Sequence, residues 1–355
     1  MKNTSYKTNL IIIFLYIGIA ITFTILLLGI DNISFKKIDW IFHGNDMTHH
    51  YVGWSFFKND IWRFPLGSNP NYGLEVSSSI VYADSIPLLA IFFKLFKNYL
   101  PTNFQYFSFW IFICFFFQGF IAYHLIKKYT NNFLYSVIGS FFFIIAPIFI
   151  CRLGIHLALA GQWLILACFY IQKISTDKIR NITWNILIII SLLVHFYIAA
   201  MCIIIYGFFL LEEFIKNKRF KIFVSKLFLT SFLIVFVMYV SGYFMVPTIQ
   251  VLGHGYGNLK MNLLSIFDPY QVNSEFTYTT WSYFLPDLPN LPGEEEGFSY
   301  IGLGGIILIL TTFYFIFVDL LFKKKIFLNI FKKNIVYLFI FVFFFIFSLS
   351  NNIDF

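Results

Sequence analysis

Residues 10–30 read LIIIFLYIGIAITFTILLLGI and contain no charged side chain. A helix rises about 1.5 Å per residue, so this run would be about 31 Å long and would match a hydrocarbon core of about 30 Å. The run is longer than the apolar core of a signal peptide, which has about 7–15 residues, and no small-residue cleavage pattern follows it. It therefore predicts an uncleaved first membrane helix.

The composition extends this prediction to the whole chain. Of its 355 residues, 59% are hydrophobic and 12% are charged, whereas soluble domains carry about 25% charged residues. The 51 phenylalanines could not be hidden from water in a soluble protein of this size. We therefore predict an all-α fold, a polytopic transmembrane helical bundle. The four cysteines lie in apolar segments without a CxxC pattern, which is typical of packing residues.

Basic and acidic residues fall in different loops. The basic clusters lie at 127–128, 173–180, 216–226 and 323–333, and with Lys2 and Lys7 they hold 17 of the 25 basic residues. The remaining loops hold 13 of the 17 acidic residues. This asymmetry follows the positive-inside rule and places the basic loops in the cytoplasm, as expected in a bacterial inner membrane. The basic clusters then anchor the topology, and nucleic acid is not an expected partner.

The rule predicts a single transmembrane domain over 1–355 with about nine membrane segments. External loops are expected at 31–102 and 247–300, and the apolar piece 86–96 is too short to cross and would lie along the interface. Residues 182–214 start and end at basic clusters, so we split them near His195 into two arms. The segments are 10–30, 104–126, 133–150, 156–171, the two arms of 182–214, 223–246, 301–322 and 336–349.

The first loop gathers polar side chains that could carry chemistry. Asp46, His49 and His50 are spaced i, i+3 and i+4, which would place them on one face of a helix. A carboxylate beside imidazoles could act as a general base, or it could bind a divalent cation, so a metal cofactor is possible although no ligand set is fixed. The alternative is that these are ordinary solvated side chains of an interfacial loop.

Two further polar sets lie at predicted helix ends. Arg152 and His156 fall on the acidic side, and the guanidinium group of an arginine suits a phosphate group. A snorkelling arginine at a helix end is the alternative. His195 and Tyr197 lie at the proposed helix break, where an ionisable residue is a candidate for function, unless His195 is simply satisfied by a neighbouring carbonyl.

Several motifs resemble those of a bacterial family of polytopic membrane proteins related to the GT-C glycosyltransferases, over nearly the whole chain. They are Asn45-Asp46, GWSFF at 53–57, WRFPLG at 62–67, YADSIPL at 82–88, Arg152 and His156 with QWLIL at 162–166, and EGFSYIG at 296–302. The resemblance implies a GT-C-like fold and an acidic catalytic base or metal ligand in the first external loop, at Asp46. Many GT-C enzymes have two acids there, and Asp84 is the next candidate. Relatives continue beyond the last residues of this chain, so it resembles a C-terminally truncated member.

Together these features predict a membrane glycosyltransferase that transfers a sugar from a polyprenyl-phosphate-linked donor to an acceptor on the outer face of the membrane. Asp46 would be the base, Arg152 and His156 would bind the donor phosphate, and His50, Asp84, His195 and Tyr197 would complete the site. The expected partners are the lipid-linked donor and membrane lipids. The rival is a transporter, flippase or assembly subunit for a lipid-linked glycan, although inverted repeats with paired interrupted helices are not evident.

Overall fold

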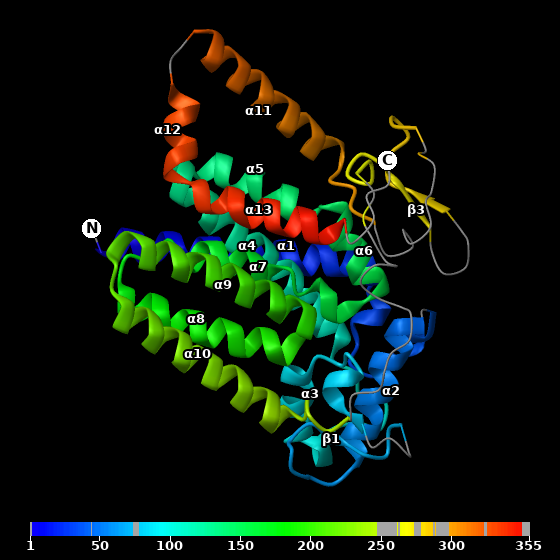
Figure 1. Ribbon diagram of the computed structural model, residues 1–355. Coiled ribbons are helices and arrows are strands. Elements are labelled where there is room, and N and C mark those ends of the chain that lie inside the picture. The colour runs from blue at the N-terminus through cyan, green and yellow to red at the C-terminus, as the bar shows by residue number, and fades with distance from the viewer. Residues whose placement is uncertain are drawn as a thin grey trace. The chain divides into compact units, whose positions relative to one another are not determined.

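The computed structural model of the protein describes residues 2–43, 45–73, 78–246, 261, 263–272, 278–286, 288, 298–322 and 325–349. These residues form thirteen α-helices and four short strands, which confirms the mainly helical class (Figure 1). The chain divides into two compact units, Met1–Ile144 with Phe149–Ile249 and Ile145–Ile148 with Gln250–Phe355. The single transmembrane domain and the GT-C likeness stay predictions.

The first unit begins with three packed helices, α1 (Lys2–Leu28), α4 (Phe107–Thr130) and α5 (Phe133–Ile144). The Tyr16 hydroxyl of α1 lies 2.6 Å from the Ser140 hydroxyl of α5. A Cβ atom on Gly119 of α4 would lie 2.7 Å from Ile144 and 2.8 Å from Tyr16, so glycine is what allows these helices to approach so closely.

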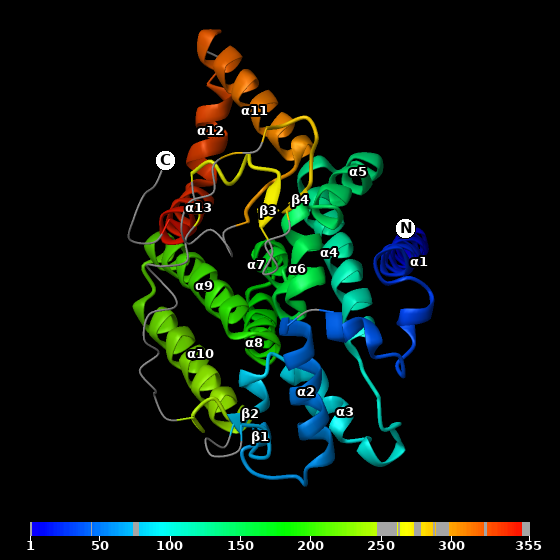
Figure 2. The same ribbon diagram turned by 90° about the vertical axis from the view of Figure 1, so that its right-hand side faces the viewer.

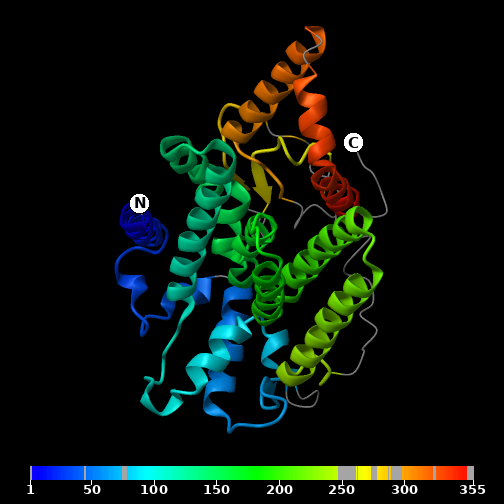
Figure 3. The ribbon, with the colours of Figure 1, turned by 90° about the vertical axis from the view of Figure 1, so that its left-hand side faces the viewer.

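Five further helices follow. They are α6 (Pro147–Ile155), α7 (Trp163–Ile171), α8 (Asp177–Val194), α9 (Phe196–Asn217) and α10 (Phe220–Ser241). The predicted break in 182–214 is confirmed, because His195 has an extended backbone (φ −162°, ψ 138°) between α8 and α9. These two helices pack against each other, and α10 packs on α8 (Figure 3). One of the last carbonyl groups of α8, that of Leu192, accepts a hydrogen bond of 2.7 Å from the Tyr243 hydroxyl.

Residues 31–102, predicted as an external loop, contain regular structure in their described part. They hold α2 (Asn45–Asn59), α3 (Pro87–Lys94) and the antiparallel pair β1 (Ser68–Asn69) and β2 (Ser78–Ser79). This region docks on the end of α10 (Figure 2). The Leu66 amide donates to the Val240 carbonyl over 2.8 Å, and the Ser79 hydroxyl donates to the Ser241 carbonyl over 3.1 Å. The short α3 agrees with a segment too short to cross a membrane.

The apolar helices indicate a multi-pass membrane protein, although which membrane it occupies stays a prediction. Among the described residues α1, α4, α9, α10 and α11 (Leu303–Leu321) are long and apolar enough to cross, and two bent helix pairs raise the number from five to seven. The prediction of nine segments also counts the short α7, and it counts α8, which has three charged residues in its first turn. Few side chains along α10 are buried, and such an apolar surface needs lipid to cover it.

The second unit contains the remaining regular elements. These are β3 (Tyr270–Val272), which pairs antiparallel with β4 (Tyr278–Thr280), and the helices α11, α12 (Ile326–Lys333) and α13 (Ile335–Ser348). The Asp319 carboxylate of α11 accepts the amides of Ile326 and Phe327, so it caps the first turn of α12. Most of the predicted loop 247–300, including its three glutamates at 294–296, lies outside the described residues, as do 350–355.

Candidate functional site

Asp84 lies in a turn between the 3-10 turn Ile80–Tyr82 and α3. Its φ of +47° is in the left-handed region, which asparagine and aspartate tolerate better than most residues. The next residue fixes this turn, because the Ser85 hydroxyl donates to the His50 carbonyl over 2.6 Å. The Tyr106 hydroxyl in turn donates to the Ser85 carbonyl. The turn is therefore held against α2 and α4, and it presents the Asp84 carboxylate.

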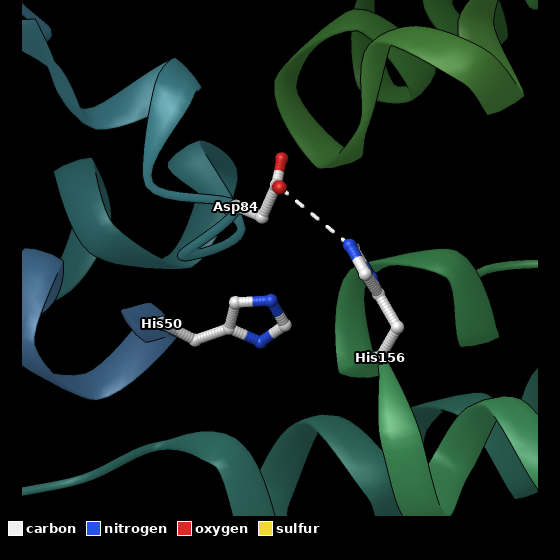
Figure 4. Close-up of side chains that lie close together, drawn as sticks. All are labelled: His50, Asp84 and His156. Atoms are coloured by element: carbon white, nitrogen blue, oxygen red, sulfur yellow. Dashed lines mark ion pairs between the residues drawn. The ribbon is translucent and has the colours of Figure 1, made fainter. Parts of the chain in front are cut away.

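Two histidines from distant parts of the chain meet this carboxylate. Nε2 of His195 lies 3.2 Å from Oδ1 of Asp84, and Nε2 of His156 lies 3.5 Å from Oδ2 (Figure 4 shows the second pair). Each oxygen of Asp84 thus faces a different imidazole. We call His50, Asp84, His156 and His195 the polar cluster.

Both histidines lie where a helix stops. His156 separates α6 from the 3-10 turn Leu157–Ala160, and its Nδ1 accepts the Leu159 amide over 3.4 Å. His195 separates α8 from α9, and its Nδ1 accepts the Tyr197 amide over 3.1 Å. The side chains act as N-caps, and this leaves the proton of each neutral ring on Nε2, facing Asp84. The local backbone therefore sets which nitrogen meets the carboxylate.

His50 completes the polar cluster from α2. Its side chain is 1% exposed and its Nδ1 has no hydrogen-bond partner. The ring centroid lies 4.8 Å from that of His156, and Figure 4 shows the His50 ring below Asp84 and beside His156. A buried ring nitrogen without a partner is costly, and a bound ligand would remove that cost.

The charges of the polar cluster are set by burial and by contacts. Burial alone would raise the pKa of Asp84, but the hydrogen bonds from His156 and His195 outweigh it and lower the pKa below its ordinary value. Burial, with a smaller contribution from the charge of His156, lowers the pKa of His50 to about 3. At neutral pH the polar cluster therefore combines an ionised carboxylate with a neutral, unsatisfied imidazole.

These residues fit a metal ion. One ligand atom each from His50, Asp84 and His156 lies within 4.8 Å of the others. Tetrahedral ligands with bonds of about 2.0–2.1 Å lie about 3.3 Å apart, so small side-chain movements would close the site. His195 would then hold the ligating carboxylate by its other oxygen, as an outer partner.

The structure separates the predicted site residues into two groups. It brings together His50, Asp84, His156 and His195. Asp46 is exposed in the first turn of α2 and does not belong to the group of possible metal ligands, which is His50, Asp84 and His156. His49, directly before His50, is also exposed, and its Nδ1 lies 3.4 Å from the Tyr72 hydroxyl. The acid that meets the histidines is thus Asp84 rather than Asp46.

The other two candidates lie beside the polar cluster. Arg152 is half-buried on α6, and its carbonyl accepts the His156 amide over 2.9 Å. The Tyr197 ring is 63% exposed, and its centroid lies 5.0 Å from that of His195.

Sequence reasoning missed three residues around Asp84. Ser85 fixes the turn as described above. The pKa of Tyr72 is raised by burial and by the charge of Asp84, and the pKa of Tyr243 is raised for the same reasons. Ser85 could have been noticed within the YADSIPL motif, but Tyr72 and Tyr243 come from separate parts of the chain, and no local pattern marks them.

One family model matches residues 17–355, and its description is "Domain of unknown function (DUF6311)". No curated protein and no solved structure matches the chain.

Proposed function

The chain belongs to the DUF6311 family, and we propose that it is a membrane glycosyltransferase that transfers a sugar from a polyprenyl-phosphate-linked donor to an acceptor. The observation that supports this best is the double contact of Asp84 with His156 and His195. It gives a largely apolar protein one fixed, ionised carboxylate whose side chain is 36% exposed and so accessible to a substrate.

The geometry favours a role for Asp84 as a fixed negative charge. A general base works best with a pKa near the working pH, and the pKa of Asp84 is below its ordinary value. The histidines present no free basic nitrogen in this state, because each Nδ1 already accepts a backbone amide. Asp84 therefore serves to bind a cation, and another group removes the proton of the acceptor hydroxyl.

We assign the holding of a divalent cation to His50, Asp84 and His156. Ligation through Nε2 of His156 would require its proton to move to Nδ1, in place of the 3.4 Å bond from the Leu159 amide. When bound, such an ion would act as a Lewis acid on the oxygen atoms of the donor phosphate. His195 keeps the carboxylate oriented by its hydrogen bond to Oδ1. Arg152, one turn before His156, is the proposed contact to the departing phosphate, since its donors suit phosphate oxygens.

Asp46 keeps its proposed role as the base that takes the proton of the acceptor hydroxyl. It is exposed one helical turn before His50, so an acceptor can reach it from solvent. The roles of the two acids can thus be separated by substitution.

The experiment compares surface glycan in cells that express wild type, Asp84→Asn or Asp46→Asn at equal levels. Asparagine keeps the size and the left-handed tolerance of Asp84 and removes only its charge. Both variants should lose the glycan. Asp39→Asn is the matched control, because within the described part of the chain this exposed acid forms an ion pair only with the exposed Lys37, so the variant should keep the glycan. Full glycan with Asp84→Asn would rule out the proposed role.

The rival function predicts a different outcome in purified protein. A transporter or flippase would move the lipid-linked sugar across a proteoliposome membrane without breaking the sugar–phosphate bond. A transferase would instead release polyprenyl phosphate, which mass spectrometry detects. Intact donor after translocation would therefore favour the rival.

A further inference from the structure

A polar groove lies between α8, α9 and α10, at the ends of these helices that are far from His195. One cavity of about 380 Å³ is lined by Asp177, Lys178, Asn181, Glu213, Arg219 and Lys226, among others. A second cavity of about 400 Å³ continues it along α10 and shares Asn181, Ile222 and Lys226 with the first. We call this surface the α8–α10 groove.

The groove carries more positive than negative charge once its ion pairs are counted. Lys226 bonds both carboxylate oxygens of Glu213, at 2.6 and 2.8 Å, and Arg180 pairs with Asp177. The groove also contains Lys178, Arg219 and Lys221, and within the described part of the chain none of the three forms an ion pair. Three cations therefore remain available to an anion.

The helix ends strengthen this charge. Both α8 and α10 begin at the groove, at Asp177 and Phe220, and neither helix has a side-chain cap on its first amides. Free amides and the positive end of the helix dipole both favour an anion, and phosphate groups are among the anions bound at such ends. The groove thus combines a cavity, unpaired cations and two helix N-termini.

We propose that the α8–α10 groove binds a phosphate group, carried either by an anionic lipid headgroup or by a soluble phosphate compound. Lys178, Arg219 and Lys221 hold the phosphate oxygens, and the uncharged Asn181 offers a further hydrogen-bond donor. The apolar Leu229 extends the lining along α10, whose exposed side chains need lipid. Basic pockets between helices are known to bind lipid headgroups in this way.

This site is separate from the polar cluster. The groove lies at the start of α8 and His195 at its end, and 18 helical residues span about 27 Å. That length is close to one hydrocarbon thickness, so the two sites lie at opposite ends of the α8–α9 pair. The proposal therefore stands whether or not the polar cluster is catalytic.

The test is a native mass spectrometry titration of the purified full chain in detergent, with phosphatidylglycerol, phosphatidylcholine and inorganic phosphate as separate probes. We expect tight binding of phosphatidylglycerol and weaker binding in Arg219→Gln/Lys221→Gln. Each basic residue near an anionic surface contributes about 1 kcal/mol, so the double variant should bind about 30-fold more weakly. Arg219→Lys/Lys221→Arg should restore most of the binding.

The matched control is Lys127→Gln/Lys128→Gln, which removes the same charge from a basic cluster outside the groove. It should change the affinity less than about twofold. An equal loss in both double variants, or no loss in either, would overturn the proposal, because the clusters would then act only as topological anchors. A third outcome would identify a soluble phosphate compound as the ligand. Inorganic phosphate would then bind as tightly as phosphatidylglycerol, and Arg219→Gln/Lys221→Gln would weaken the binding of both equally.

Discussion

His195 Nε2 lies 3.2 Å from Asp84 Oδ1, and His195 is also the residue at which α8 gives way to α9. The helix break and the carboxylate contact therefore depend on each other. In an uninterrupted helix the Tyr197 amide would donate to a backbone carbonyl four residues earlier. It would then no longer donate to Nδ1 of His195, and this bond is what fixes the ring. The break thus orients an imidazole toward a carboxylate from the first loop.

His195→Gln should weaken metal binding without abolishing it. His195 touches only the ligating carboxylate, and loss of such an outer partner typically costs about 10–100-fold in metal affinity. His156→Gln removes a proposed ligand and should abolish measurable binding. Isothermal titration with Zn²⁺ distinguishes the two. Equal affinities in wild type and both variants would show that the polar cluster holds no metal ion.

Gly53→Ala should destabilise the protein and displace Asp84. A Cβ atom there would lie 2.3 Å from the Cβ of Ala83, directly before Asp84. Overpacking of this kind costs about 1–3 kcal/mol. Gly207→Ala is the matched control, because nothing lies within 4 Å of its added Cβ and alanine is favoured over glycine in a helix by up to about 1 kcal/mol. Thermal unfolding measured in detergent should show a lowered midpoint for Gly53→Ala and not for Gly207→Ala.

Helix positions were predictable because apolar run length and flanking charge determine where a chain can cross a membrane. The break at His195 followed from the same rule, since one straight helix would have placed 216–221 on the wrong side. The bend between α5 and α6 was not predicted from charge, because it falls where Pro147 begins α6 and removes a helical hydrogen bond.

The members of the site were also predictable, but their partnership was not. His50, His156 and His195 stood out as polar residues in an apolar chain, and Asp84 was named through the resemblance as the candidate for a second acid. The choice of Asp46 over Asp84 as the principal acid rested on the resemblance and on local spacing. Neither the resemblance nor local spacing reports tertiary contacts. The turn at Asp84 is fixed by the hydrogen bond from Ser85 to the His50 carbonyl of α2, and no local pattern reveals this bond.

Stability should fall as the pH drops from about 6.5, and His50 should cause part of this fall. Burial lowers the pKa of His50 from 6.5 to about 3, so between these values the unfolded chain takes up a proton that the folded chain does not. One such proton reduces stability by about 1.4 kcal/mol per pH unit. The lowered pKa of Asp84 contributes only near and below its ordinary value of 3.8, so the window from pH 4.5 to 6.5 excludes the contribution of Asp84.

His50→Gln should flatten the dependence of the unfolding midpoint on pH in that window, measured with chelator present. His49→Gln, on the exposed side of the same helix, should keep the wild-type slope. Identical slopes in all three proteins would show that His50 is not held neutral by burial.

Lys94→Met should leave stability at pH 7 unchanged or higher. The Lys94 ammonium is buried 3.8 Å from the Phe57 ring centroid and 4.9 Å from that of Trp62, with one hydrogen bond of 3.3 Å to the Ile61 carbonyl. Cation–π contacts and a charged hydrogen bond contribute a few kcal/mol in total, about as much as desolvation of the charge costs. Methionine fills the same space and makes favourable contacts with aromatic rings.

The pH dependence separates loss of the charge from loss of packing at Lys94. Burial lowers the pKa of Lys94 from 10.5 to about 8, so between these values the unfolded chain holds a proton that the folded chain has released. Lys94 should therefore make stability rise with pH across this window, so the slope of wild type should be more positive than that of Lys94→Met. Lys128→Met, at an exposed lysine, should retain the wild-type slope. Equal slopes of the unfolding midpoint in wild type and Lys94→Met between pH 8 and 10 would show that the ammonium is not desolvated where it lies.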